Sequence, residues 1–138
     1  MAVKLIAAMP GPGFIALDSS CWIEYFRDTA RAELFASVVQ GPERLIVPII
    51  TIYEVTKKMR RELDETIAAL SESVMCRGRV VDIDLALVRQ AVTLNLPLGD
   101  SLIYAVAQAH GATLWTQDAH FAGMPGVKYF AMGYAEAP

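Results

Sequence analysis

The sequence predicts an α/β fold in which helices cover both faces of an open parallel sheet. Short runs that are wholly apolar, such as FIAL at 14–17, are typical of strands buried on both faces. They alternate with longer segments whose apolar residues recur at spacings of three and four, which is typical of helices. With 138 residues, 54% of them hydrophobic and 20% charged, the chain can bury one sizeable core, and we expect a single domain.

The same patterns predict five strands and the helices between them. The strands are expected at 14–17, 44–48, 79–83, 112–116 and 127–130. The helices are expected at 21–27, 30–40, 49–77 with a bend allowed within it, 84–95 and 100–110, with a short helical turn at 118–123. Gly41-Pro42, Pro97 and Gly111 mark the ends of helical segments.

The N-terminal residues and the apolar stretches indicate where the domain begins and where in the cell the protein is expected. Residues 1–13 end in PGPG and are expected to form a loose extension before a single domain at 14–138. Every apolar stretch is broken before the roughly 18 residues that suggest a membrane span, and the opening apolar core is too short for a secretory signal. We therefore expect a cytoplasmic protein with no membrane partner. Cys21 and Cys76 lack the paired spacing of a zinc site and are expected to be buried free thiols.

Four acids are expected to meet at one edge of the sheet. Asp18 and Asp118 directly follow the first and fourth predicted strands, and parallel strands deliver their carboxyl ends to the same edge. Asp100 lies at the start of a helix that runs antiparallel to the fourth strand, so this start is expected at the same edge. Glu54 lies on the helix after the second strand. Each aspartate taken alone could be a helix N-cap, and Glu54 could face solvent. Their joint placement favours a site.

Several carboxylates packed together repel one another, so a cation is expected among them. Oxygen ligands with no cysteine or obvious histidine suit Mg²⁺ or Mn²⁺ rather than zinc. A pair of divalent ions about 3.5–4 Å apart can clamp the attacking and leaving oxygens of a phosphodiester. The acids therefore predict metal-assisted hydrolysis of a phosphodiester, with one or two ions left open.

Basic residues on the helix of Glu54 favour a polyanionic substrate. Lys57, Lys58 and Arg61 follow Glu54 by three, four and seven residues, which places them on one side of the helix, and Arg60 adds breadth. A solvated basic face is the alternative. The net charge is −3, so the chain without the four acids carries +1. A pI of about 5.3 argues against coating a long nucleic acid and favours a short or folded RNA.

The chain resembles the PIN-domain ribonucleases, and within them the VapC toxins of bacterial and archaeal toxin–antitoxin pairs. The resemblance covers nearly all of residues 14–130 and is carried by FIALDSSCWIEYF, IITIYEVTKKM, LPLGDSLIYAVAQAHGATLWTQD and HFAGMPGVKYF. It implies a PIN-like three-layer α/β/α fold with a five-stranded parallel sheet. It also implies that Asp18, Glu54, Asp100 and Asp118 are the catalytic acids and hold Mg²⁺ or Mn²⁺. Thr116 would then hydrogen-bond a carboxylate or a metal-bound water.

Beyond the residues, the resemblance implies a homodimer that hydrolyses RNA to a 3′-hydroxyl and a 5′-phosphate and is silenced by a cognate antitoxin. Ser19 or Ser20 could assist Asp18, and the sequence does not choose between them. The 13-residue extension is longer than such proteins commonly have. The RNA target and the antitoxin are not readable from the sequence.

Other functions fit the residues less well. A noncatalytic RNA-binding or regulatory PIN module is the alternative, and the presence of all four acids disfavours it. A phosphoacceptor receiver domain would have adjacent acids after its first strand, whereas Ser19 follows Asp18. His110 is expected to interact with the carbonyls at a helix end, and His120 is expected at the surface, although it could face the crevice.

Overall fold

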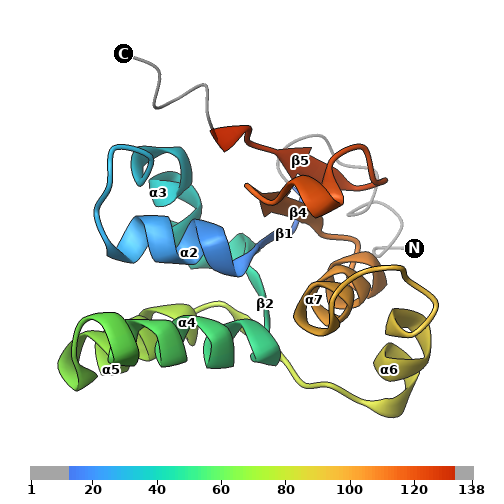
Figure 1. Cartoon of the computed structure of the whole chain (residues 1–138), viewed down its shortest axis with the longest axis horizontal. Helices are drawn as coiled ribbons and strands as arrows, with labels where there is room; N and C mark the ends of the chain where they lie inside the picture. Colours follow the sequence, from blue (N-terminus) through green and yellow to red (C-terminus); the bar gives the residue numbers. More distant parts are fainter. Residues whose placement is uncertain (1–12, 133–138) are drawn as a thin grey trace.

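The computed structural model of the chain describes residues 13–132 (Figure 1). Its strands, all three or four residues long, are β1 (Ile15–Leu17), β2 (Ile46–Pro48), β3 (Arg79–Val81), β4 (Thr113–Thr116) and β5 (Val127–Tyr129). The α-helices are α2 (Ser19–Phe26), α3 (Glu33–Gln40), α4 (Ile49–Glu62), α5 (Glu65–Met75), α6 (Leu85–Ala91) and α7 (Leu98–Ala109). Two short 3₁₀ helices are η1 (Pro42–Arg44) and η2 (Ala119–Phe121).

All strand pairs are parallel, as predicted, but the five strands are split across two sheets. β1, β4 and β5 form one sheet in the order β1-β4-β5, and β2 pairs with β3 in the other. A single parallel bridge between Ile15 and Leu45 connects the two. The expectation of one continuous sheet is therefore corrected. Pro48, at the end of β2, has no backbone N–H to donate to a neighbouring strand, which weakens the ladder at this point.

The strands separate two hydrophobic clusters, which gives the three predicted layers. Ile15, Leu17 and Val47 pack with buried residues of α2, α3, α4 and α5. Ala16 and Ile46, which alternate with them, pack with buried residues of α6 and α7. Figure 1 shows α2 to α5 gathered on the left of the molecule and α6 and α7 on the right. Because β1 and β2 are buried on both faces, their sequences are apolar at every position.

The helices agree with the sequence prediction except at their boundaries. The long segment after β2 is two helices, because Asp64 caps the second by accepting from the backbone N–H of Ile67. α7 begins at Leu98, so Asp100 lies within its first turn rather than before it. Gly111 adopts a φ of 62° just beyond this helix, where glycine avoids the penalty of a side chain.

Three other expectations concern the cysteines, the extension and the membrane. Cys21 is buried and Cys76 is exposed, and both thiols are free, so burial was predicted correctly only for Cys21. The predicted extension at 1–13 lies outside the described residues apart from Gly13. Among the helices of residues 13–132, none has the length and apolar character needed to cross a membrane.

Candidate metal centre

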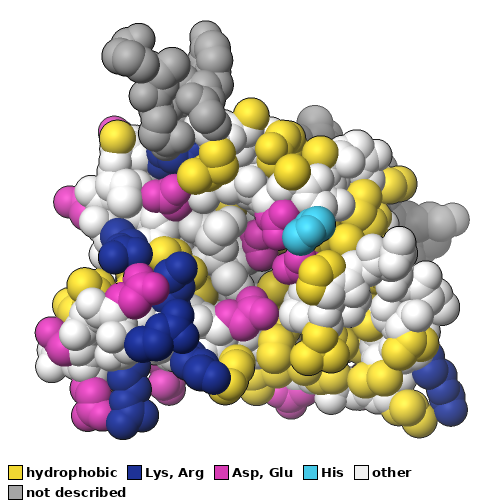
Figure 2. Space-filling view, in the orientation of Figure 1, with side chains coloured by type: hydrophobic (Ala, Val, Ile, Leu, Met, Phe, Trp, Pro, Cys, Tyr) yellow, Lys and Arg dark blue, Asp and Glu magenta, His cyan; other side chains and the backbone are white. Residues whose placement is uncertain are grey.

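The structure brings the four predicted acids to the carboxyl edge of the strands. Asp18 directly follows β1, and Asp118 lies two residues after the end of β4. Glu54 lies on α4 after β2, and Asp100 lies in the first turn of α7. The charge of each of the other three acids raises the pKa of Asp100, so the four carboxylates are close enough to interact. Figure 2 shows acidic side chains gathered beside a histidine near the middle of this face.

Asp18 is the most deeply buried of these acids, with 4% of its surface exposed. Its Oδ1 accepts from the backbone N–H of Ser19 at 2.7 Å, and its Oδ2 accepts from Thr116 Oγ1 at 2.7 Å. Burial raises the pKa of Asp18 and the charges of Asp118 and Glu54 raise it further, while the two hydrogen bonds lower it. The capping alternative is therefore also true, because Asp18 is the N-cap of α2 and a member of the cluster.

Thr116 connects two of the acids. Its hydroxyl donates to Asp18, and the same oxygen accepts from the backbone N–H of Asp118 at 2.9 Å. Thr116 has no exposed surface, so this arrangement is not subject to competition from bulk water. The hydrogen bond to a carboxylate that the resemblance implied for Thr116 is present in the structure.

Glu54 lies between α2 and the first turn of α7. Ser19 Oγ donates to Glu54 Oε1, whereas Ser20 Oγ donates to Asp18 Oδ2 at 3.4 Å. The two serines thus orient different acids, which the sequence did not resolve. A Cβ added to Gly99 would overlap Glu54 Oε2, so only glycine lets this carboxylate lie so close to the backbone of α7. The sequence analysis did not single out Gly99.

The carboxyl group of Asp100 is strongly perturbed by its surroundings. Burial and the charges of the other three acids raise its pKa from 3.8 to about 6, and His120 lowers it. A carboxyl group next to like charges ionises less readily unless a cation compensates them. The cluster is therefore suited to a bound cation.

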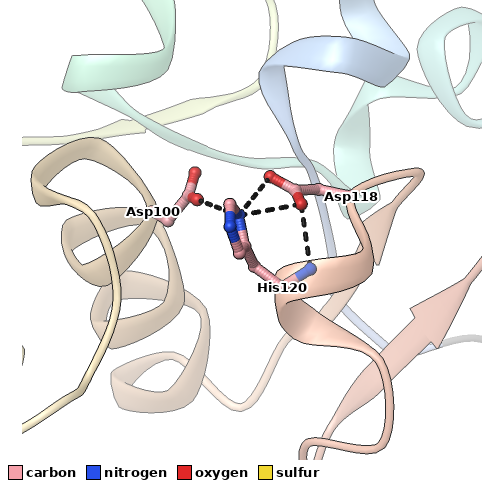
Figure 3. A group of neighbouring side chains, drawn as sticks. All are labelled: Asp100, Asp118 and His120. Carbon is pink, nitrogen blue, oxygen red and sulfur yellow. Dashed lines mark hydrogen bonds and ion pairs between the residues drawn. The ribbon is translucent and has the colours of Figure 1, made fainter.

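His120 belongs to this cluster, although we expected it to be an ordinary surface residue. Its Nδ1 lies 3.0 Å from Asp118 Oδ1 and 3.5 Å from Asp100 Oδ2, as Figure 3 shows. The hydrogen bond and charge of Asp118 raise the pKa of the imidazole. The expected exposure is correct, since 60% of the side chain is accessible, but the ring turns toward the acids. The sequence held one signal that His120 could join the acids, which is its position two residues after Asp118 in a predicted helical turn.

The predicted basic residues divide between two sides of α4. Lys58 and Arg27 line a pocket of about 560 Å³ that also includes Asp118 and Ser20. Lys57 instead donates to the hydroxyl of Tyr53 at 2.9 Å and lines a separate pocket with Arg60. Arg61 Nη2 lies 3.7 Å from Glu62. Of the basic residues on α4, Lys58 is therefore the one that shares a pocket with a cluster acid.

A buried arginine supports the segment that carries Thr116 and Asp118. Arg31 is 4% exposed, and its Nε donates to Gln117 Oε1 while its Nη2 donates to the carbonyl of Phe130 at 3.3 Å. Gln117 in turn donates to Glu24 Oε2 at 3.2 Å. This network joins the loop after α2, the end of β4 and the segment after β5. Sequence reasoning missed it, because nothing in the spacing of these residues indicates that they meet.

The donors at this edge fit a divalent cation. Ligand atoms of Asp100, Asp118 and His120 all lie within 4.8 Å of one another. Asp18 and Glu54 add carboxylate oxygens close by, held by Thr116 and Ser19. Carboxylates are the ligands that Mg²⁺ and Mn²⁺ prefer, and one imidazole is compatible with the latter.

A parallel α/β domain with acids collected at the carboxyl edge of its strands has the organisation of the PIN domain. The sequence profile of the PIN domain matches residues 15–127. The chain therefore belongs to the PIN domain family. A search among curated proteins finds no match.

Solved toxin structures resemble the chain over most of its length. A toxin–antitoxin complex from Klebsiella pneumoniae is 25% identical, with a TM-score of 0.69, and the alignment covers 83% of this chain and 95% of that chain. VapC20 of Mycobacterium tuberculosis, described as a sarcin-ricin loop cleaving toxin, is 17% identical with a TM-score of 0.64, covering 79% and 95%. DNA-bound VapBC from Salmonella typhimurium is 18% identical with a TM-score of 0.65, covering 86% and 97%. At these lower identities the likeness concerns the fold.

Proposed function

We propose that the chain is a metal-dependent endoribonuclease that hydrolyses RNA phosphodiester bonds as the toxin of a toxin–antitoxin pair. The convergence of four acids, brought from four separate segments to one edge of the strands, carries the proposal. A module that only binds RNA has no need for such mutually repelling carboxylates. Membership of the PIN family and the likeness to toxin structures support the same conclusion.

In this proposal Asp18, Glu54, Asp100 and Asp118 hold Mg²⁺ or Mn²⁺. When bound, the ion supplies positive charge that stabilises the phosphodiester transition state and activates water. Thr116 fixes the orientation of Asp18 by donating to Oδ2. The carboxylates of Asp18 and Glu54 are oriented by the hydroxyl groups of Thr116 and Ser19.

The RNA backbone is proposed to lie along the pocket beside Asp118. Lys58 and Arg27 line this pocket and are proposed to contact phosphates near the acids, for which they would have to exchange their ion pairs with Glu62. Lys57 and Arg61, which we also predicted to bind RNA, do not line this pocket and are assigned weaker contacts with flanking phosphates. The few basic residues agree with selective engagement of a short or folded RNA.

The proposed partners are RNA, an antitoxin and a second copy of the chain. The Klebsiella pneumoniae relative is described as a toxin–antitoxin complex, which supports a cognate antitoxin for this chain. The homodimer rests on the family resemblance and stays a prediction.

Metal removal tests the proposed chemistry. Protein treated with EDTA should leave a folded RNA intact, and added Mg²⁺ or Mn²⁺ should restore cleavage because the ion supplies charge that the acids cannot. The measurement is gel analysis of end-labelled RNA, with the product ends identified as 3′-hydroxyl and 5′-phosphate. Cleavage that persists at full rate in EDTA would refute metal dependence. RNA binding without cleavage under any metal would favour the noncatalytic alternative.

Expression in cells tests the biological part separately. Growth arrest that is relieved by co-expression of a small protein encoded next to the chain's gene would support the toxin assignment. A chain that cleaves RNA in vitro but does not arrest growth would instead be a housekeeping nuclease.

Gly99→Ala tests the position of Glu54. Alanine is favoured over glycine in a helix by about 0.5–1 kcal/mol, but its Cβ would displace the carboxylate of Glu54. We expect an unchanged or raised melting temperature together with a loss of cleavage on the order of 100-fold, as misplacement of a catalytic group can cause. Gly13→Ala is the control, since a Cβ there has no neighbour within 4 Å. Full activity of Gly99→Ala would mean that Glu54 need not lie where the structure has it.

A further inference from the structure

We propose that His120 is an additional ligand of the divalent ion, through Nδ1, and that this nitrogen makes the site prefer Mn²⁺ over Mg²⁺. The inference rests on the proposed function, because it concerns the ion of the same site. It goes beyond the four acids, which are all oxygen ligands.

The positions of three side chains carry the inference. Ligand atoms that occupy adjacent positions around one octahedral ion at about 2.1 Å stand about 3 Å apart. His120 Nδ1 lies 3.0 Å from Asp118 Oδ1 and 3.5 Å from Asp100 Oδ2, which is close to this separation for both acids. In Figure 3 the ring lies between the two carboxylates. The three side chains therefore lie at separations that suit ligands of one ion.

The backbone places the imidazole in this position. Asp118 caps η2 by accepting from the N–H of His120 at 2.9 Å, which holds the histidine close to its carboxylate. The polar contacts of the ring within residues 13–132 are to these two acids, so an ion bound at Nδ1 would replace the proton that Nδ1 shares with Asp118. His110 differs, because its Nδ1 lies 3.0 Å from the carbonyl of Val106 at the end of α7.

An imidazole ligand has consequences for the choice of metal. Mg²⁺ favours oxygen ligands and keeps several waters, whereas Mn²⁺ and later divalent metals gain from a nitrogen ligand. The majority of carboxylates still disfavours soft metals. The combination of acids with one imidazole therefore favours Mn²⁺ among the two ions expected for this site.

The test measures Mn²⁺ directly rather than through activity. Tag-free protein is required, because the chain has only two histidines and a histidine tag would add others. Electron spin-echo spectroscopy of the Mn²⁺ complex should detect a directly coupled ¹⁴N in the wild type and in the His110→Ala control, and should lose it in His120→Ala. Titrations followed by Mn²⁺ electron paramagnetic resonance and by calorimetry with Mg²⁺ measure the preference. His120→Ala should lower Mn²⁺ affinity by at least about tenfold and Mg²⁺ affinity much less.

The outcomes separate this inference from the proposed function. Mn²⁺ that binds and supports cleavage, but shows no coupled nitrogen, would overturn the role of His120 and leave the nuclease intact. A nitrogen coupling that survives in His120→Ala would also overturn the role of His120 and would leave the proposed nuclease function intact. If the wild type binds neither ion, the metal-dependent function and the inference both fail.

Discussion

Asp100→Asn is expected to lower metal-dependent RNA cleavage by on the order of a thousandfold, the scale seen when one member of a catalytic unit is removed. The amide keeps the shape of the side chain but removes the negative charge that the proposed ion requires. Within residues 13–132 the polar contact of the Asp100 side chain is with the exposed His120, at 3.5 Å, and not with a core group, so the fold should persist. Cleavage rates at saturating Mn²⁺ and the circular dichroism spectrum measure the two effects.

The same substitution should change how stability depends on pH in metal-free protein. The pKa of Asp100 is raised from 3.8 to about 6 by burial and by the neighbouring acids. Between these values the folded state holds the proton and the unfolded state does not. The contribution of Asp100 to stability is thus complete below pH 3.8 and is lost as the pH rises through about 6.

Melting curves in EDTA from pH 4 to pH 8 therefore test the electrostatics of the cluster. The wild type should lose more stability over this range than Asp100→Asn, and at pH 8 the variant should melt at the same temperature or higher. Asp64→Asn is the matched control, because Asp64 only caps α5 and asparagine caps equally well. Parallel curves for the wild type and Asp100→Asn would contradict the close approach of the four acids. Undiminished cleavage by Asp100→Asn would refute its assignment as a ligand.

Arg31→Met is expected to destabilise the protein by about 3 kcal/mol, because it leaves buried partners without a donor. Gln117 Oε1 and the carbonyl of Phe130 would lose their hydrogen bonds, and Glu24 would lose a cation 3.9 Å away. Methionine retains much of the side-chain volume, so the change reports the lost polar contacts more than a cavity. Urea unfolding measures the effect. The slope of the unfolding free energy against urea concentration should be unchanged, so that a lower midpoint reports lower stability.

Arg27→Met is the matched control for this prediction. Arg27 also pairs with a glutamate, at 2.8 Å from Glu62, but its side chain is 40% exposed. Exposed ion pairs contribute about 0–1 kcal/mol, so this variant should remain close to the wild type. Equal stability of the two variants would mean that the buried network contributes no more than a surface pair.

Much of the fold was predictable because local patterns reflect burial. The apolar runs at 14–17 and 112–116 correspond to β1 and β4, and the order of strands and helices is as expected. The split between the two sheets was not predictable, because it depends on which strands become neighbours. Element boundaries were less certain, as the start of α7 two residues before Asp100 illustrates.

The candidate site was predictable to a similar extent. Asp18 and Asp118 follow strands whose parallel arrangement brings their ends together, so their meeting follows from the fold class. The orientation of His120 was not predictable, because it depends on the packing of η2 against the first turn of α7. Helical spacing placed Lys57 and Lys58 near each other, but the neighbouring α2 and α5 decide that they line different pockets.

The sequence by itself determined the layers of the fold and the identity of the acids at its carboxyl edge. Strand-end position is a local property and is sufficient for Asp18 and Asp118, whereas Asp100 and Glu54 were assigned from their helices and from the family resemblance. Only the tertiary structure decided that Gly99 makes room for Glu54, that His120 lies between two carboxylates and that Arg31 supports Gln117 from 86 residues away. These contacts join segments distant in the chain, and their distances and burial are set by how the helices pack around the strands.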